Sequence, residues 1–170
     1  MAAQSTYTPI ATYNAAGNSA TFTFTNIPQN YTDLVIVWSA LSTVNNSSQM
    51  SFTYTTNGGQ RTLAAGGSGS GSSYSTTNSN YIYLANIPTN LSTTIPYSGI
   101  IYCNNYSNTN TYKTFLCKAG QDLNGSGGLM LAVASSFTTS GITSVGFSTN
   151  NGSNYFATAS TFTLYGITAA

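Results

Sequence analysis

Charged side chains are scarce in this sequence. Only 3% of the 170 residues are Asp, Glu, Lys or Arg, whereas ordinary soluble domains have about 25%. Three basic side chains are too few for the clustered positive charge that nucleic acids and anionic membrane surfaces require. We therefore expect neither nucleic acid nor a membrane as a partner.

Histidine and glutamate are absent, and Asp33 and Asp122 are the only carboxylate side chains. A glycosidase would have to use these two as its catalytic pair. Asp33, however, precedes an apolar run, where an aspartate at a turn usually accepts hydrogen bonds from its own backbone. Cys103 and Cys117 have no histidine to generate a thiolate nucleophile. We predict no catalytic residue, and a protein that is not an enzyme.

Metal and cofactor ligands are equally scarce. Zinc needs more Cys or His than two cysteines. The segment Asp122-Leu-Asn-Gly-Ser-Gly-Gly128 has a faint similarity to a calcium loop, but a glycine-rich turn explains it better. The glycine-rich residues 64–73 lack the Gly-Lys-Ser/Thr ending of a phosphate-binding loop. We expect no metal, no cofactor and no residue that binds one.

Long hydrophobic runs are also missing. The longest, residues 34–38 and 129–134, are far shorter than the roughly 20 residues that span a bilayer. Residues 1–9 have neither the basic nor the apolar part of a secretory signal, so we expect synthesis in a host cytoplasm. Free thiols are the expected state there. Cys103 and Cys117 lie at the ends of two strand candidates, however, and pairing across a hairpin stays open.

Aromatic residues, in contrast, are abundant: thirteen Tyr, eight Phe and one Trp. Together with 41% hydrophobic residues, they exclude a disordered chain. Apolar and polar residues alternate strictly in residues 20–25, 50–55 and 160–167, which is typical of half-buried antiparallel strands. Residues 34–38 and 129–133 are continuously apolar and predict central strands covered on both faces. Further strand candidates are residues 7–13, 81–84, 98–103, 113–117 and 144–148.

About ten short strands without a helical stripe predict an all-β fold. We expect residues 1–170 to form a single domain, an antiparallel two-sheet β-sandwich of jelly-roll type. An up-and-down barrel is the alternative. Residues 64–73 have a linker-like composition and are expected to form a long loop at one end of the sandwich.

The chemistry that remains is that of a neutral surface. Charge is depleted, and Tyr, Phe and Met are enriched, in the buried parts of protein interfaces. A surface with so few charges can be buried against a partner with little desolvation cost. This composition favours a subunit of an assembly, although a neutral solvated domain would share it. The sequence does not indicate which face is the interface.

Two segments resemble a known family. Asn26-Ile-Pro-Gln-Asn-Tyr-Thr-Asp-Leu-Val-Ile-Val37 and Ala159-Ser-Thr-Phe-Thr-Leu-Tyr-Gly-Ile167 are similar to small virion structural proteins of tailed bacteriophages, particularly those of cyanobacteria and marine bacteria. The resemblance extends over the whole chain, and the terminal Ser-Thr-Phe-x-Leu-Tyr-Gly-Ile element is its most specific part. It implies a β-sandwich on the particle exterior, as a capsid decoration protein or an appendage of the tail.

The leading hypothesis is therefore a non-enzymatic virion protein, a capsid decoration or cement protein that stabilises the shell. Its expected partners are the major capsid protein or tail proteins and further copies of itself, with a trimer as one form. The alternative is a module of a tail fibre or baseplate that contacts host-surface glycans through neutral Tyr-, Asn- and Ser-rich loops.

Overall fold

The computed structural model describes residues 6–45, 50–54, 58–66, 71–77, 81–85, 91–124, 127–149 and 154–168. This part of the chain contains twelve strands and no helix, and hence no helix long and apolar enough to cross a membrane. The strands are β1 (Tyr7–Asn14), β2 (Thr21–Phe24), β3 (Asp33–Ala40), β4 (Met50–Thr53), β5 (Gly58–Gly66), β6 (Gly71–Thr77), β7 (Tyr81–Ala85), β8 (Tyr97–Cys103), β9 (Lys113–Asp122), β10 (Gly127–Ser136), β11 (Val145–Ser148) and β12 (Thr161–Ile167).

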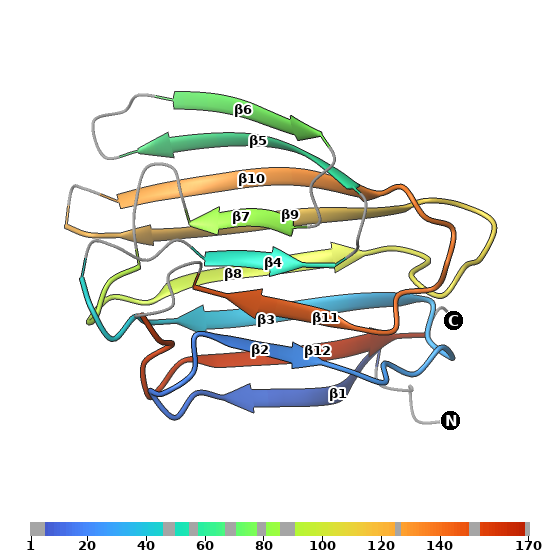
Figure 1. The fold of residues 1–170 in the computed structure, drawn as a ribbon, viewed down its shortest axis with the longest axis horizontal. Helices are drawn as coiled ribbons and strands as arrows, with labels where there is room; N and C mark the ends of the chain where they lie inside the picture. Colours follow the sequence, from blue (N-terminus) through green and yellow to red (C-terminus); the bar gives the residue numbers. More distant parts are fainter. Residues whose placement is uncertain are drawn as a thin grey trace.

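The strands form two sheets that lie one in front of the other (Figure 1). The larger sheet has eight strands in the order β1-β12-β3-β8-β9-β10-β5-β6. The smaller sheet has four, in the order β2-β11-β4-β7. All neighbouring strands are antiparallel. The predicted antiparallel two-sheet sandwich is confirmed.

Each of the ten predicted strands is present, and the structure adds two. The prediction of a long loop at residues 64–73 is wrong: residues 64–66 belong to β5 and residues 71–73 to β6, while residues 67–70 lie outside the described part of the chain. The two strands pair with each other, and β5 also pairs with β10 over nine positions. Backbone groups make these ladders whatever the side chains are, so a linker-like composition did not reveal them.

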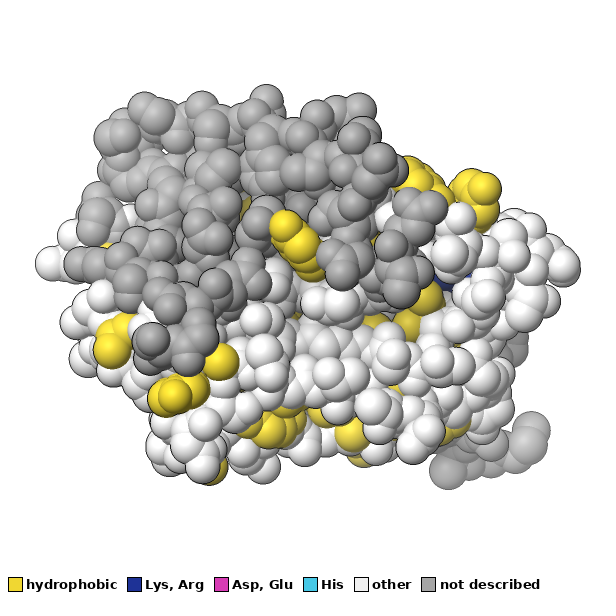
Figure 2. All heavy atoms as spheres, viewed as in Figure 1, with side chains coloured by type: hydrophobic (Ala, Val, Ile, Leu, Met, Phe, Trp, Pro, Cys, Tyr) yellow, Lys and Arg dark blue, Asp and Glu magenta, His cyan; other side chains and the backbone are white. Residues whose placement is uncertain are grey.

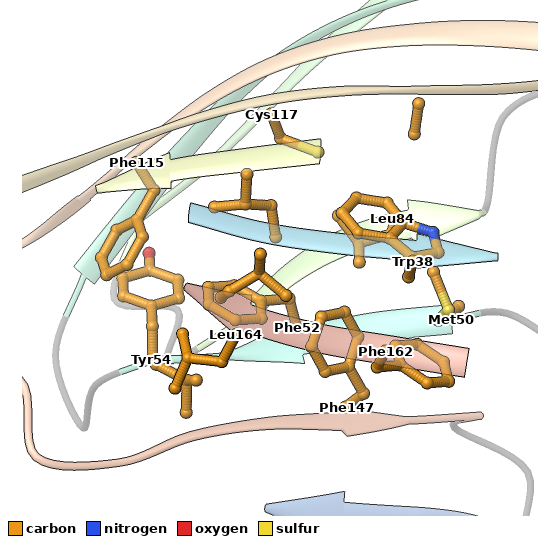
Figure 3. Close-up of a cluster of buried hydrophobic side chains, with 14 of the residues drawn as sticks. Trp38, Met50, Phe52, Tyr54, Leu84, Phe115, Cys117, Phe147, Phe162 and Leu164 are labelled. Atoms are coloured by element: carbon orange, nitrogen blue, oxygen red, sulfur yellow. The ribbon is translucent and has the colours of Figure 1, made fainter. Parts of the chain in front are cut away.

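The core lies between the two sheets and is rich in aromatic rings (Figure 3). Phe147 of β11 is central to it. Its ring centroid lies 4.8 Å from that of Phe162, 5.2 Å from that of Phe52 and 5.8 Å from that of Trp38. Phe162 and Trp38 come from the larger sheet and Phe52 from the smaller one. Ring pairs at these distances add to the hydrophobic stabilisation of burial, so this cluster joins the two sheets.

Two strand glycines make room for aromatic rings. A Cβ atom at Gly99 of β8 would lie 2.2 Å from Cζ2 of Trp38, the residue that pairs with Gly99 in β3. A Cβ atom at Gly166 of β12 would lie 2.3 Å from Cγ of Tyr31. Glycine in a strand often marks such a close approach. Both rings therefore depend on the missing side chain beneath them.

Candidate functional site

The two carboxylates lie far apart. Asp33 is the first residue of β3 and Asp122 the last residue of β9. The register through β8 places Asp33 level with Thr114, at the opposite end of β9 from Asp122. Eight residues of strand between Thr114 and Asp122 correspond to roughly 27 Å, whereas a glycosidase pair is separated by about 5 to 10 Å. The fold does not bring these two groups together.

Asp33 instead holds a turn that is distant in sequence. Its Oδ1 accepts a hydrogen bond of 2.8 Å from the backbone N–H of Asn105, which follows β8 and has a φ of 49°. The sequence led us to expect a bond to the backbone next to Asp33, and that prediction is wrong. The turn between β8 and β9 lies beside the start of β3 because β3 and β8 pair, and a sequence alone does not show that neighbour.

Cys103 and Cys117 are buried and free. Cys103 pairs with Phe115, whereas Cys117 pairs with Ile101. The two cysteines are therefore diagonal neighbours, and Cβ atoms in that relation lie roughly 7 Å apart, too far for a disulfide. Burial raises the pKa of Cys103 to about 12, with a smaller opposing effect of the Lys113 charge. Burial also raises the pKa of Cys117.

Because the pKa values of both thiols are raised, we expect the protein to lose stability in alkaline solution. Their raised pKa values mean that the unfolded chain gives up its thiol protons near pH 9 while the folded chain retains them. Stability is therefore complete below about pH 9 and decreases as the pH rises towards 12. Because histidine and glutamate are absent, the free energy of unfolding in urea should change little from about pH 6 to pH 8 and fall by pH 10.5.

The control for this experiment is Cys103→Ala, which should show a shallower alkaline decrease than the natural chain. Tyr54, whose pKa is raised by burial to about 12, contributes in the same direction in both proteins. Equal free energies of unfolding at pH 8 and pH 10.5 would contradict the prediction.

Among the described residues, no group of three or more His, Cys, Asp or Glu side chains could hold a metal ion. In the segment 122–128, whose sequence is faintly similar to a calcium loop, all residues except 125 and 126 are described.

Lys113 is fully buried at the start of β9. Its Nζ atom donates hydrogen bonds of 2.7 and 3.1 Å to the backbone carbonyls of Thr111 and Thr139. These bonds join the segments that precede β9 and follow β10.

The outer side of the larger sheet is an apolar surface. Its most exposed members are Val37 (41%), Leu116 (40%), Leu129 (61%), Leu131 (41%) and Val133 (39%), which we call the apolar face. The prediction that residues 129–133 are covered on both sides is therefore wrong. Met130 and Ala132 point into the core, but nothing in the described chain covers the alternate leucines and valine. Residues 34–38 are covered more completely, because only Val37 is exposed there.

The apolar face is continuous across four neighbouring strands. In one row Val133 of β10 pairs with Leu116 of β9, and Leu116 pairs with Tyr102 of β8. In the next row Leu131 pairs with Lys118, Lys118 with Ile100, and Ile100 with Val37. With strands about 4.8 Å apart, the axes of the two outer strands of this face are roughly 14 Å from each other. Large contiguous apolar surfaces on soluble proteins usually mark an interaction site.

The outer side of the smaller sheet is different, because it carries a hollow of about 380 Å³. Gly146 of β11 pairs with Thr23 of β2 on one side and Thr53 of β4 on the other. Because Gly146 has no side chain, the sheet surface is depressed between Thr23 and Thr53, and this depression is the bottom of the hollow. Hydroxyl groups of Thr21, Thr23, Thr53, Ser144 and Ser148 line it.

A second hollow of about 230 Å³ adjoins the first, and the two share Tyr54 and Ser144 as lining residues. Thr138, Ser140 and Thr143 add further hydroxyl groups. No charged side chain is present among the described residues that line the two hollows. Figure 2 views the molecule over the smaller sheet, where the described surface is mostly neutral and polar and the hydrophobic groups are small and separate.

The sequence does not reveal either surface. A run of apolar residues such as 129–133 predicts a buried strand, because the run is the same whether or not its second side is covered. The hollow had one signal, a glycine inside the alternating strand Val145-Gly-Phe-Ser148, which indicates a close approach or a missing side chain. Its threonine neighbours on β2 and β4 come from segments more than 90 residues away in the chain.

No known family model matches the chain, and no match was found among curated proteins or solved structures. The two outer surfaces are therefore what supports a functional proposal.

Proposed function

We propose that this chain is a non-enzymatic structural protein of a virion exterior, a capsid decoration protein that attaches to the shell through the apolar face. The apolar face is the observation that carries the proposal. Five exposed aliphatic side chains on one sheet surface lose contact with water when a partner covers them. On β3, β8, β9 and β10, Lys118 is the only charged residue in the two rows of this surface, and Arg61 of β5 pairs with Val133 at its edge. Covering this surface therefore desolvates at most two charges.

The strand order supports the proposal at the level of the fold. Without the hairpins β5-β6 and β9-β10, the sheets are β1-β12-β3-β8 and β2-β11-β4-β7. We infer that these eight strands are a jelly roll with two inserted hairpins, an architecture shared by viral capsid and lectin domains. Since one fold serves many functions, this order supports a virion protein only together with the apolar face. The inserted β9 and β10 carry four of the five residues of that face.

A decoration protein stabilises its shell by mass action, because it binds the assembled shell and not the free subunits. Particles that lack the protein should therefore lose resistance to heat, and adding the purified protein should restore it. Because the apolar face is nearly uncharged, binding should change little between about 0.05 and 0.5 M salt. Equal heat resistance with and without the protein would exclude a cementing role, and strongly salt-dependent binding would exclude the apolar face as the contact.

A double variant, Leu116→Thr with Leu131→Thr, tests the surface directly. Both side chains are about 40% exposed, and threonine suits a strand, so folding should be nearly unchanged while binding to particles falls at least tenfold. The matched control replaces two exposed apolar residues elsewhere, Val44→Thr with Tyr112→Thr, and should bind normally. Normal binding of the Leu116→Thr, Leu131→Thr variant would contradict the proposal.

The alternative function is a tail fibre or baseplate module that contacts host glycans. The hydroxyl-lined hollow on the smaller sheet favours it, since neutral hydroxyl groups are suited to sugars. Locating the chain in a cryo-EM map of the intact particle separates the two: density on the head supports decoration, and density on the tail supports the alternative.

A further inference from the structure

The hollow over Gly146 lies on the smaller sheet, on the opposite side of the sandwich from the apolar face. If the protein attaches to a shell through the apolar face, the hollow stays open to solvent. We propose that this hollow is a binding site for a neutral oligosaccharide. Its volume of about 380 Å³ lies within the range of about 300 to 1,000 Å³ that is usual for small-molecule sites.

Three hydroxyl groups of the hollow are available to a ligand. Those of Thr23, Thr53 and Ser144 make no hydrogen bond to another described residue, and all three side chains are exposed. A hydroxyl group both donates and accepts hydrogen bonds. The hydroxyl groups of a sugar do the same, so each contact can form in either direction. Phe22, Val145 and Phe147 also line the first hollow, so it presents both hydroxyl groups and apolar groups, as the surface of a sugar does.

The lining also selects against charged ligands. Among the described residues, no acidic or basic side chain lines either hollow, so a sialic acid or a uronic acid would lose water around its carboxylate without gaining a cation. A neutral sugar has no such cost.

The second hollow extends the site. It adjoins the first at Tyr54 and Ser144 and continues along the segment that precedes β11, where Thr138, Ser140 and Thr143 lie. Two connected hollows with the same neutral, hydroxyl-rich lining fit two or more successive sugar units. The ligand class is therefore an oligosaccharide, with its first unit over Gly146.

A sugar site in the hollow is independent of a role in a virion, because the residues of the hollow are not those of the apolar face. Sugar binding can therefore be measured on the purified full-length protein. Loss of particle binding in the Leu116→Thr, Leu131→Thr variant tests the proposed function alone, because that variant retains the hollow. A failure of sugar binding and a failure of particle binding can therefore be told apart.

The test is a titration of the protein with trisaccharides, followed by calorimetry and by NMR. The neutral probes are maltotriose, mannotriose and chitotriose; the acidic probes are sialyllactose and trigalacturonate. We expect at least one neutral trisaccharide to bind with a dissociation constant below about 1 mM, with little dependence on salt. Both acidic probes should bind at least tenfold more weakly. Absence of binding by all neutral probes at 10 mM, or a preference for the acidic probes, would overturn the proposal.

Three variants connect binding to the hollow. Thr23→Val with Thr53→Val retains the shape of both side chains and removes two hydroxyl groups, so affinity should fall at least tenfold. Gly146→Ala raises the floor, because its Cβ atom would lie 3.1 Å from Oγ1 of Thr23, and should also weaken binding. The matched control, Thr114→Val with Thr161→Val, makes the same change on the outer side of the larger sheet and should bind normally. Unchanged affinity in the Thr23→Val, Thr53→Val variant would place the ligand elsewhere and overturn the assignment.

Discussion

Replacing Gly99 by alanine should lower the free energy of unfolding by about 3 kcal/mol or more, at the upper end of the range for overpacked cores. The new Cβ atom would lie 2.2 Å from Cζ2 and 2.6 Å from Cη2 of Trp38, and 2.7 Å from the backbone oxygen of Lys118. Moving the indole relieves only the first two contacts. The carbonyl belongs to the ladder between β8 and β9, so relieving the third contact shifts a central pair of strands.

The indole has little freedom to move. Trp38 is 2% exposed, and its ring lies among core side chains of both sheets (Figure 3). Its Nε1 atom is buried and makes no hydrogen bond among the described residues, so packing alone determines where the ring lies. A small displacement of the ring therefore disturbs the contact with Phe147 at 5.8 Å.

Urea unfolding of Gly99→Ala, Trp38→Leu and the double variant measures this coupling. The double variant should lose less than the sum of the two single variants, because leucine removes the clash with the ring. Gly146→Ala is the control glycine substitution, since its closest contacts are 3.1 Å, and its loss should be clearly smaller. A Gly99→Ala protein with the stability of the natural chain would show that Trp38 is not packed over Gly99.

Replacing Phe147 by alanine should cost about 3 to 5 kcal/mol, the usual loss for removing a buried phenylalanine. The ring is 1% exposed and touches rings of both sheets, those of Phe22, Phe52, Phe162 and Trp38. The cavity left behind is bordered by rigid rings that cannot collapse into it without moving a strand. At this chain length the midpoint of thermal unfolding should fall by roughly 10 °C.

Phe137→Ala is the matched control, because it removes the same side chain at a position that is 42% exposed. Phe137 has one ring contact among the described residues, with Tyr112 at 6.0 Å, so its loss should be about 1 kcal/mol or less. Similar thermal midpoints for the two variants would contradict the assignment of Phe147 to the centre of the core.

Alternation, together with short apolar runs bounded by turn residues, was sufficient to predict ten strands and the sandwich. Phe22 and Phe24 in β2, and Phe162 and Leu164 in β12, alternate with threonines because one side of each strand faces the core and the other faces water. That pattern depends only on the period of a strand. The hairpin β5-β6 carries no such pattern, and its strands exist because the edge of β10 provides a partner for the backbone of β5.

The pattern of apolar and polar residues does not predict the apolar face or the hollow. Residues 34–38 and 129–133 are equally apolar, yet Val35 is fully buried and Leu131 is 41% exposed. Whether the second side of a strand is covered depends on residues remote in sequence, or on another molecule. The hollow likewise requires β2, β11 and β4 to be neighbours, because Gly146 leaves a depression only between Thr23 and Thr53.

An all-β sandwich with an aromatic core and almost no charge follows from the amino-acid sequence, because strand period and composition are local properties of the chain. The division of the neutral surface into an apolar face and a hydroxyl-lined hollow depends on the tertiary fold, because both surfaces are made of rows across strands. One such row joins Val37, Ile100 and Leu131, whose separation along the chain contains no information about which strands lie side by side.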